Sequence, residues 1–196
     1  MRCFLKKSRE GRCGRGRRTR TTKGGVAVQT ALLVIDMQND YLWAQRTGRF
    51  SYDTPRLVAS VNGLIHRHQR VIYIRHIIQN LPTNRLLFGY SIAGTEGAEL
   101  YGGLDVVSGH CFDKYFGDAL TNGALRKLLK AQGVDTVRLC GLDECGCVAA
   151  TALGAVRRGL KAEILRRGTA TVFPAAKVSD THERLRRAGV RWRDEG

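Results

Sequence analysis

Residues 140–151 read CGLDECGCVAAT, and the chain changes character within them. An apolar strand, expected over 136–142, runs into a turn punctuated by Gly141 and Gly146. A helix of small residues follows, with a thiol, Cys147, in its first turn. Unpaired N–H groups and the positive end of the dipole at a helix N-terminus stabilise the thiolate, the nucleophilic form of cysteine. The stretch therefore predicts an α/β unit that presents a reactive sulfur at a strand end.

The alternation of short apolar runs with amphipathic segments extends over the rest of the chain. It is typical of a parallel sheet covered by crossover helices. We expect an α/β, three-layer Rossmann-like fold, with a six-stranded, mostly parallel sheet and helices on both faces. Helices are expected after Thr54-Pro55, after Thr121, after Cys147 and at the capping sequence Asp180 to Glu183. The expected strands are 31–37, 71–77, 104–108, 136–142, 161–165 and 190–193.

Chemically useful side chains fall at or just beyond the ends of these strands. Asp36 ends the run from Ala31 to Ile35, His76 closes the second strand, and Lys114 follows the third. Ligands bind at the carboxyl ends of the strands in an open parallel sheet, and the glycine-rich segment 79–103 is expected to cross that edge. An acid, a base and a nucleophile at different strand ends indicate an enzyme.

The charge of the chain is concentrated at its N-terminus. The formal net charge is +16, but residues 1–24 hold ten of the 33 Lys and Arg residues and one of the 17 Asp and Glu residues. The remaining 172 residues therefore carry only +7. With little apolar content, this leading segment is expected to be a basic disordered tail. A transit peptide, a nucleic-acid arm and an over-extended translation start remain as alternatives.

The remaining composition indicates a soluble protein in a reducing compartment, and we expect a cytoplasmic location. No apolar run reaches the roughly 20 residues of a membrane span, so no membrane partner is expected. Six cysteines in a chain able to bury an ordinary core do not resemble a disulfide scaffold. Cys145 and Cys147 lack the neighbouring ligands of a zinc site, and we expect no metal and no cofactor.

Three motifs, in order, resemble those of the isochorismatase-like cysteine hydrolases, which include nicotinamidases and N-carbamoylsarcosine amidohydrolase. Residues 31–40, ALLVIDMQND, look like the opening strand with its catalytic aspartate. Residues 94–97 resemble a glycine turn of the family, and Lys114 matches its lysine. Residues 141–152 look like the nucleophile turn. The resemblance covers most of residues 30–190 and assigns residues 25–196 to one hydrolase domain.

The resemblance implies a triad of Asp36, Lys114 and Cys147. Lys114 would ionise the thiol, whose reference pKa is about 8.5, and Asp36 would take up the proton and pass it to the leaving nitrogen. The backbone N–H groups of Asp143 and Cys147 would form the oxyanion hole, next to a cis peptide between Leu142 and Asp143. The implied reaction cleaves a C–N bond of a small amide, ureido or carbamoyl substrate through a cysteine thioester. Relatives commonly form dimers or tetramers, so a homo-oligomer is expected.

Two departures from the family motifs argue against particular reactions of the family, and residues close in sequence to the triad are candidates for contacts with the substrate. Metal-dependent nicotinamidases carry Asp-x-His with further histidines after the second strand, where this chain has Arg75 to Ile78, so nicotinamidase is disfavoured. Isochorismatases proper lack the catalytic cysteine and hydrolyse a vinyl ether, so the presence of Cys147 argues against that reaction as well. Substrate contacts are expected from Gln38, Tyr41, His76 and Phe116, although core packing explains an aromatic side chain equally well.

A second hypothesis comes from another functional class. In it the chain is a catalytically idle member of the family that serves as a binding or assembly module, and the basic tail contacts nucleic acid. Apart from that tail, nucleic acid is not an expected partner.

Overall fold

The computed structural model describes residues 28–46, 48 and 50–195. The basic segment 1–24, together with the nucleic-acid contact and the alternatives attached to it, lies outside these residues. No helix in the described part is long and apolar enough to cross a membrane.

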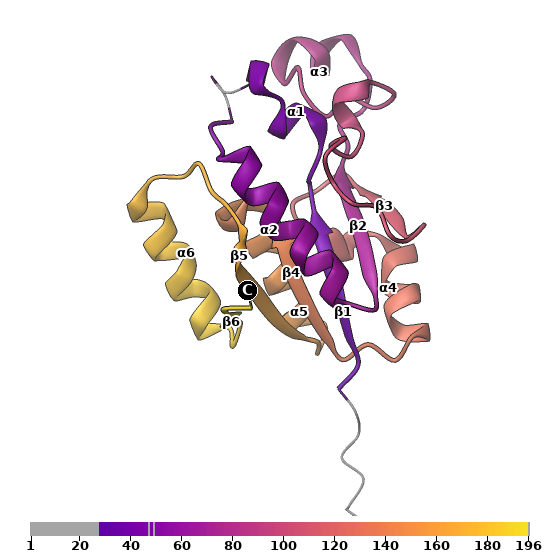
Figure 1. Cartoon of the computed structure of the whole chain (residues 1–196), viewed down its shortest axis with the longest axis vertical. Helices are drawn as coiled ribbons and strands as arrows, with labels where there is room; N and C mark the ends of the chain where they lie inside the picture. The colour runs from indigo at the N-terminus through magenta and orange to yellow at the C-terminus, as the bar shows by residue number, and fades with distance from the viewer. Residues whose placement is uncertain (1–27, 47, 49, 196) are drawn as a thin grey trace, which may run out of the picture.

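Six strands form a single sheet in the order β3-β2-β1-β4-β5-β6, and every neighbouring pair is parallel (Figure 1). The predicted α/β class is confirmed. The strands are β1 (Thr30–Ile35), β2 (Val71–His76), β3 (Cys111–Lys114), β4 (Thr136–Gly141), β5 (Lys161–Thr169) and β6 (Arg191–Arg193). The α-helices are α1 (Asn39–Leu42), α2 (Thr54–Arg67), α3 (Pro82–Leu87), α4 (Gly123–Ala131), α5 (Ala149–Arg157) and α6 (Ala175–Arg187). The shorter turns are η1 (Ala44–Arg46), η2 (Glu96–Ala98), η3 (Ala119–Thr121) and η4 (Glu144–Val148), the last of which is π-helical.

Two apolar clusters cover the two faces of the sheet and give the expected three layers. On one face, Leu57, Val61 and Leu64 of α2 pack against alternate residues of β1 such as Leu32. On the other face, the buried residues of α4, α5 and α6 pack against the intervening side chains, including Leu33. Figure 1 shows α2 on the opposite side of the sheet from α4 and α5. Because both faces are covered, β1 reads as the continuous apolar run typical of a central parallel strand.

The helices begin where their capping chemistry is satisfied. Asp53 accepts a hydrogen bond from the N–H of Arg56 at the start of α2, and Pro55 occupies the first turn. Asn122 caps α4 in the same way. The predicted start of the last helix at Asp180 is wrong, because α6 begins at Ala175, directly after Pro174. The good helix formers Ala175 and Ala176 extend the helix, so the predicted cap falls inside it.

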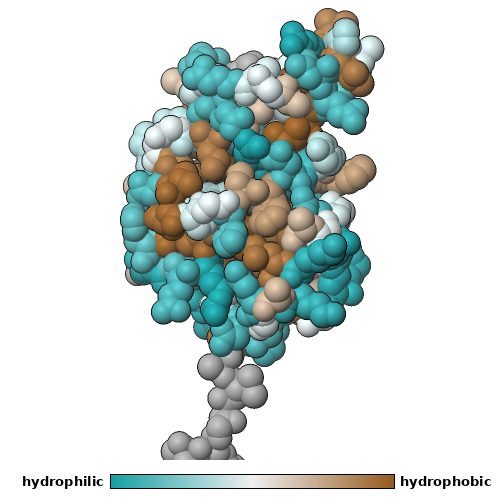
Figure 2. All heavy atoms as spheres, turned by 90° about the vertical axis from the view of Figure 1, so that its right-hand side faces the viewer, coloured by the Kyte–Doolittle hydropathy of each residue, from teal (hydrophilic) through white to brown (hydrophobic). Residues whose placement is uncertain are grey.

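The predicted third strand, 104–108, is also wrong. The strand is β3, whose His76↔Lys114 and Tyr73↔Cys111 pairs with β2 set its register. Val106 and Val107 are exposed in the preceding loop, which is held by hydrogen bonds between the Tyr73 hydroxyl and the backbone of Asp105 and Val107. Figure 2 shows apolar side chains interrupting the hydrophilic surface on the side of the molecule that carries β3.

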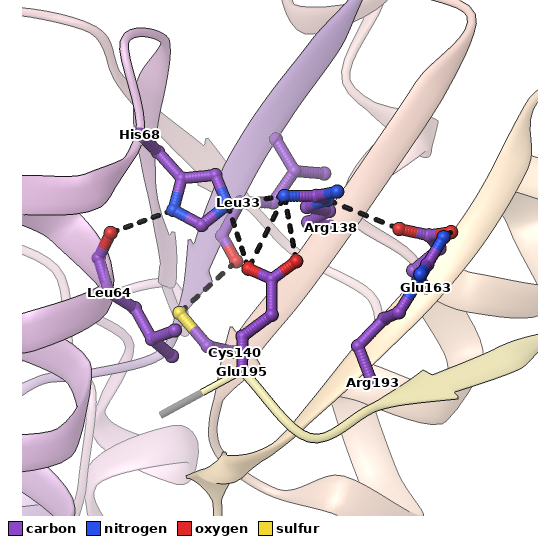
Figure 3. A network of polar contacts seen from close by, with 8 residues as sticks. All are labelled: Leu33, Leu64, His68, Arg138, Cys140, Glu163, Arg193 and Glu195. Carbon is purple, nitrogen blue, oxygen red and sulfur yellow. Dashed lines mark hydrogen bonds and ion pairs between the residues drawn. The ribbon is translucent and has the colours of Figure 1, made fainter. Parts of the chain in front are cut away.

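The C-terminal strand is fastened to the sheet by ionic contacts (Figure 3). Glu163 of β5 accepts hydrogen bonds from Arg138 of β4 and from Arg193 of β6. Glu195 forms an ion pair with Arg138 at 3.0 Å and lies 3.7 Å from the ring of His68. These contacts stabilise the attachment of β6 without involving the carboxyl edge of the sheet.

The order of the strands creates a switch point between β1 and β4. The chain proceeds from β1 through β2 to β3 on one side, and from β4 through β5 to β6 on the other. Gly141 lies at this point with φ of +104°, and a Cβ there would meet the carbonyl oxygen of Ile35 at 2.1 Å. A glycine is therefore required for β4 to leave the sheet beside β1. Asp36 and the nucleophile turn flank the crevice, where ligands of open α/β sheets bind.

Candidate active site

Asp36, Lys114 and Cys147 come together at the carboxyl edge of the sheet. The Nζ of Lys114 lies 2.9 Å from Oδ2 of Asp36 and donates to Sγ of Cys147 at 3.1 Å. The Lys114 side chain has no exposed surface, and that of Asp36 is 4 % exposed. The sequence-predicted acid, base and nucleophile therefore form one buried cluster.

Each of the three residues is positioned by a different element. Asp36 directly follows β1 in a left-handed conformation, with φ of +52°. Lys114 ends β3 and reaches past β2 to the end of β1. Cys147 lies in η4, whose N-cap residue Asp143 accepts a hydrogen bond at its side chain from the N–H of Cys145. A left-handed backbone is uncommon for a residue other than glycine and is found at functional sites, so the conformation of Asp36 marks this edge.

The resting sulfur is a neutral thiol, which corrects the expectation of an ionised one. Burial and then the negative charge of Asp36 raise the pKa of the Cys147 thiol, Lys114 only partly opposes both, and the resulting pKa is about 12. Burial alone would lower the pKa of Lys114, but this pKa is raised, chiefly by the negative charge of Asp36, with which the ammonium is also paired. Lys114 therefore stays cationic, while the proton of Cys147 must leave during the reaction.

Asp36 has an oxygen available for that proton. Its Oδ2 forms the ion pair with Lys114, whereas its Oδ1 is buried and has no hydrogen-bond partner among the described residues. A buried carboxylate oxygen that is left unpaired lowers the stability of the fold, so its presence in a protein requires an explanation such as a catalytic role. The geometry thus suits Asp36 to accept a proton from the adjacent thiol.

A cavity of about 220 Å³ opens onto Cys147. Its lining residues come from segments at or beyond the ends of β1, β2, β4 and β5, and five of the twelve are Phe or Tyr. A volume below the usual 300–1,000 Å³ of drug-sized ligand sites suits only a small molecule. The lining residues are Asp36, Tyr41, Phe50, Tyr52, His76, Tyr90, Leu142, Asp143, Gly146, Cys147, Val172 and Phe173.

Two of the four predicted substrate contacts line this cavity. Tyr41 and His76 both face it and are joined by a 3.1 Å hydrogen bond between the hydroxyl and Nδ1. Burial, together with the charge of Lys114, lowers the pKa of His76 below 6.5, so its ring is neutral at pH 7. Burial and Asp36 raise the pKa of the Tyr41 phenol well above 10, so this hydroxyl keeps its proton.

The other two lie elsewhere. Gln38 is fully buried, and its amide binds the backbone of His76 and Ala98, which leaves it no free donor for a ligand. Phe116 is 69 % exposed in the loop after β3 and, with Tyr115, lines a neighbouring hollow that shares His76 and Tyr90 with the cavity. Gln38 therefore supports η2 instead of lining the cavity, and Phe116 does not line the cavity either.

The predicted cis peptide between Leu142 and Asp143 is wrong, because the described residues contain only trans peptide bonds. The left-handed Gly141 provides the sharp change of direction, and Leu142 still donates to the carbonyl of Ile35 at 2.8 Å. The trans form of a non-proline bond is favoured by about 3–4 kcal/mol. Asp143 and Cys147 both line the cavity, as the predicted oxyanion donors must.

Sequence reasoning missed several wall residues, above all Tyr52, Tyr90 and Phe173. Tyr41, Phe50 and Tyr90 pack edge to face, with ring centroids 4.9 to 5.7 Å apart. Aromatic residues in loops carry no periodic signal, and only the fold brings them together. No group of three His, Cys, Asp or Glu side chains suited to a metal ion occurs within the described ranges.

Comparison with known proteins agrees with this architecture. The family model described as the isochorismatase domain matches residues 30–194. An uncharacterized isochorismatase family protein from Bacillus subtilis is 27% identical over 148 residues, which span 72% of this chain and 78% of that protein.

Solved structures are similar along nearly their whole length. N-carbamoylsarcosine amidase from Thermoplasma acidophilum superposes with a TM-score of 0.71 at 24% identity, covering 86% of this chain and 99% of that one. A nicotinamidase/pyrazinamidase from Bacillus subtilis gives 0.71 at 22% identity, covering 85% and 100%. At such identities the likeness establishes the fold.

Proposed function

Because the chain belongs to the isochorismatase family of hydrolases, we propose that it cleaves the C–N bond of a small amide, ureido or carbamoyl compound through a thioester on Cys147. The observation that carries this proposal is one buried ammonium that lies 2.9 Å from a carboxylate and 3.1 Å from a thiol, both of which belong to residues lining a small cavity. That arrangement provides a nucleophile, a proton acceptor and a fixed positive charge.

In the proposed first step, Sγ of Cys147 attacks the carbonyl carbon while its proton moves to Asp36. The positive charge of Lys114 stabilises the sulfur as it loses the proton. The carbonyl oxygen becomes an oxyanion, which the backbone N–H groups of Asp143 and Cys147 would stabilise. A neutral thiol in the resting state is compatible with this step, because the proton leaves only as the new bond forms.

In the second step, Asp36 returns the proton to the nitrogen, the C–N bond breaks, and the amine or ammonia leaves an acyl thioester on Cys147. Water then attacks the thioester and gives a proton to Asp36. The C–S bond breaks, the sulfur regains a proton, and the product leaves as a carboxylic acid. Asp36 thus serves in turn as base and acid, and no group beyond substrate and water is consumed.

The test is a panel of primary amides, ureido acids and cyclic amides with detection of released ammonia, combined with mass spectrometry of trapped enzyme. An aldehyde or amide analogue should add its mass to the peptide that contains Cys147, and Cys147→Ala should abolish turnover. Cys145→Ala is the matched control, since this cysteine is buried two residues away and does not line the cavity. Turnover that survives Cys147→Ala would refute the proposal.

A further inference from the structure

The carboxylate of Asp143 connects three segments around the cavity. Oδ1 accepts hydrogen bonds from the N–H of Cys145 at 2.8 Å and from the hydroxyl of Thr171 at 2.7 Å. Oδ2 accepts from the hydroxyl of Tyr52 at 3.0 Å and from the N–H of Val172 at 2.9 Å. Each oxygen thus holds two donors, so the carboxylate joins the loop before α2, the nucleophile turn and the loop after β5.

The donors of this network are suited to a carboxylate. Burial, followed by the charge and the hydrogen bond of Asp143, raises the pKa of the Tyr52 phenol far above 10, so the hydroxyl stays protonated and donates. Two further donors are backbone N–H groups, which cannot reverse their role. The arrangement therefore requires an acceptor at both side-chain oxygens of residue 143.

The backbone of Asp143 is held as well. Its carbonyl oxygen accepts from the N–H of Gly146 at 3.0 Å and from that of Val148 at 3.1 Å. Its own N–H, by contrast, donates to no group in the part of the chain that the structure describes. Residue 143 lines the cavity beside Cys147. Every acceptor of this residue is thus engaged, and its one remaining donor belongs to a residue that lines the cavity.

We propose that Asp143 is a positioning residue, whose carboxylate fixes the direction of its own backbone N–H toward the oxyanion that forms beside Cys147. This inference rests on the proposed function, because only acyl transfer creates that oxyanion. An N–H that is held in place before the reaction stabilises developing charge without reorganisation, and this preorganisation is the main source of oxyanion-hole catalysis. The same carboxylate holds Tyr52 and Val172, so the neighbouring walls of the cavity keep their places.

The decisive variant is Asp143→Asn. An amide presents a donor where one of the two oxygens accepted, so the backbone N–H of either Cys145 or Val172 loses its acceptor and the hydroxyl beside it must reverse its role. We expect kcat for amide hydrolysis to fall about 10- to 100-fold, because an oxyanion donor is worth 10²–10³ and a misplaced one loses part of that. KM should change less than about threefold, since the oxyanion exists only in the transition state.

Alkylation of Cys147 by iodoacetamide separates positioning from folding. The sulfur attacks a saturated carbon and displaces iodide, so no oxyanion forms. The rate of Cys147 alkylation in Asp143→Asn should therefore stay within about threefold of the wild-type rate. Glu144→Gln is the matched control, because this neighbouring carboxylate holds Thr169 and His182 instead of the cavity residues. Its kcat should stay within about threefold of wild type.

Further outcomes bear on the proposal in distinct ways. Wild-type kcat in Asp143→Asn, or a parallel loss of hydrolysis and alkylation, would overturn the role of Asp143 alone. Absence of wild-type turnover across the amide panel would overturn the proposed function and this role with it.

If Asp143→Asn fails to fold, as judged by circular dichroism, the variants Tyr52→Phe and Thr171→Val test the role of Asp143 instead, since each removes one donor. Each is expected to lower kcat about 3- to 10-fold, with alkylation unchanged, and wild-type kcat in both would overturn the role.

Discussion

Replacing Lys114 with methionine tests the electrostatics of the cluster most directly. The ammonium lies 2.9 Å from Oδ2 of Asp36. At an effective dielectric constant of about 20, that separation corresponds to roughly 6 kcal/mol of attraction. Removing one partner of a buried ion pair typically costs about 3–5 kcal/mol, because the remaining charge has no counter-charge. We therefore expect Lys114→Met to lower the free energy of unfolding by about 3–5 kcal/mol.

Urea unfolding at pH 7, followed by circular dichroism, measures this loss. In the double variant Asp36→Asn/Lys114→Met both charges are removed, so the cost should be clearly smaller than the sum of the two single substitutions. Lys127→Met is the control, since this lysine is exposed on α4, and it should change stability by less than about 0.5 kcal/mol. A coupling energy below about 1 kcal/mol, or a loss in Lys114→Met no larger than in Lys127→Met, would refute the reasoning.

Three further predictions follow from the described contacts. The rate of Cys147 alkylation should rise about tenfold per pH unit from pH 7 to 10 without levelling off, because a thiol with a pKa of about 12 gains thiolate throughout that range. A plateau near pH 8 would contradict this prediction. Gly141→Ala should cost at least about 3 kcal/mol in urea unfolding, because a Cβ would lie 2.1 Å from the carbonyl oxygen of Ile35, and a loss under 1 kcal/mol would show that β4 can shift. The ring of His76 should titrate with a midpoint below 6.5 when followed by NMR, since burial and Lys114 disfavour its cationic form, and a midpoint above 6.5 would place a carboxylate nearer than Lys114.

The fold follows from the sequence wherever an element is buried on both faces. β1 and the first four residues of β2 are continuous apolar runs, β4 is interrupted only by Arg138 between apolar residues, and the predicted extents of all three are close to those observed. β3 was missed because it reads Cys-Phe-Asp-Lys, and only pairing with β2 makes those four residues a strand. Val106 and Val107 have the residue types of a strand and lie instead in an exposed loop, which shows how tertiary pairing overrides propensity.

The residues of the site also divide into those that the sequence predicts and those that only the fold brings together. Asp36, Lys114 and Cys147 were predictable because each matches a residue in the ordered motifs of the family that the sequence resembles, even though the strand that ends at Lys114 was missed. The walls were not predictable, since Tyr52 and Phe173 belong to loops whose return over the cavity has no sequence period. The protonation state of Cys147 was mispredicted because it depends on burial, which outweighs the lysine beside it.

The buried thiol also gives the chain an internal reporter of its own assembly. In an unfolded molecule Cys147 has the ordinary pKa of a cysteine, about 8.5, and reacts with alkylating reagents at that rate. Once β1, β3 and β4 are aligned, the same sulfur is enclosed and its pKa rises to about 12. A brief pulse of reagent during refolding, read at the Cys147 peptide by mass spectrometry, would therefore label chains whose central strands have not yet joined faster than folded chains.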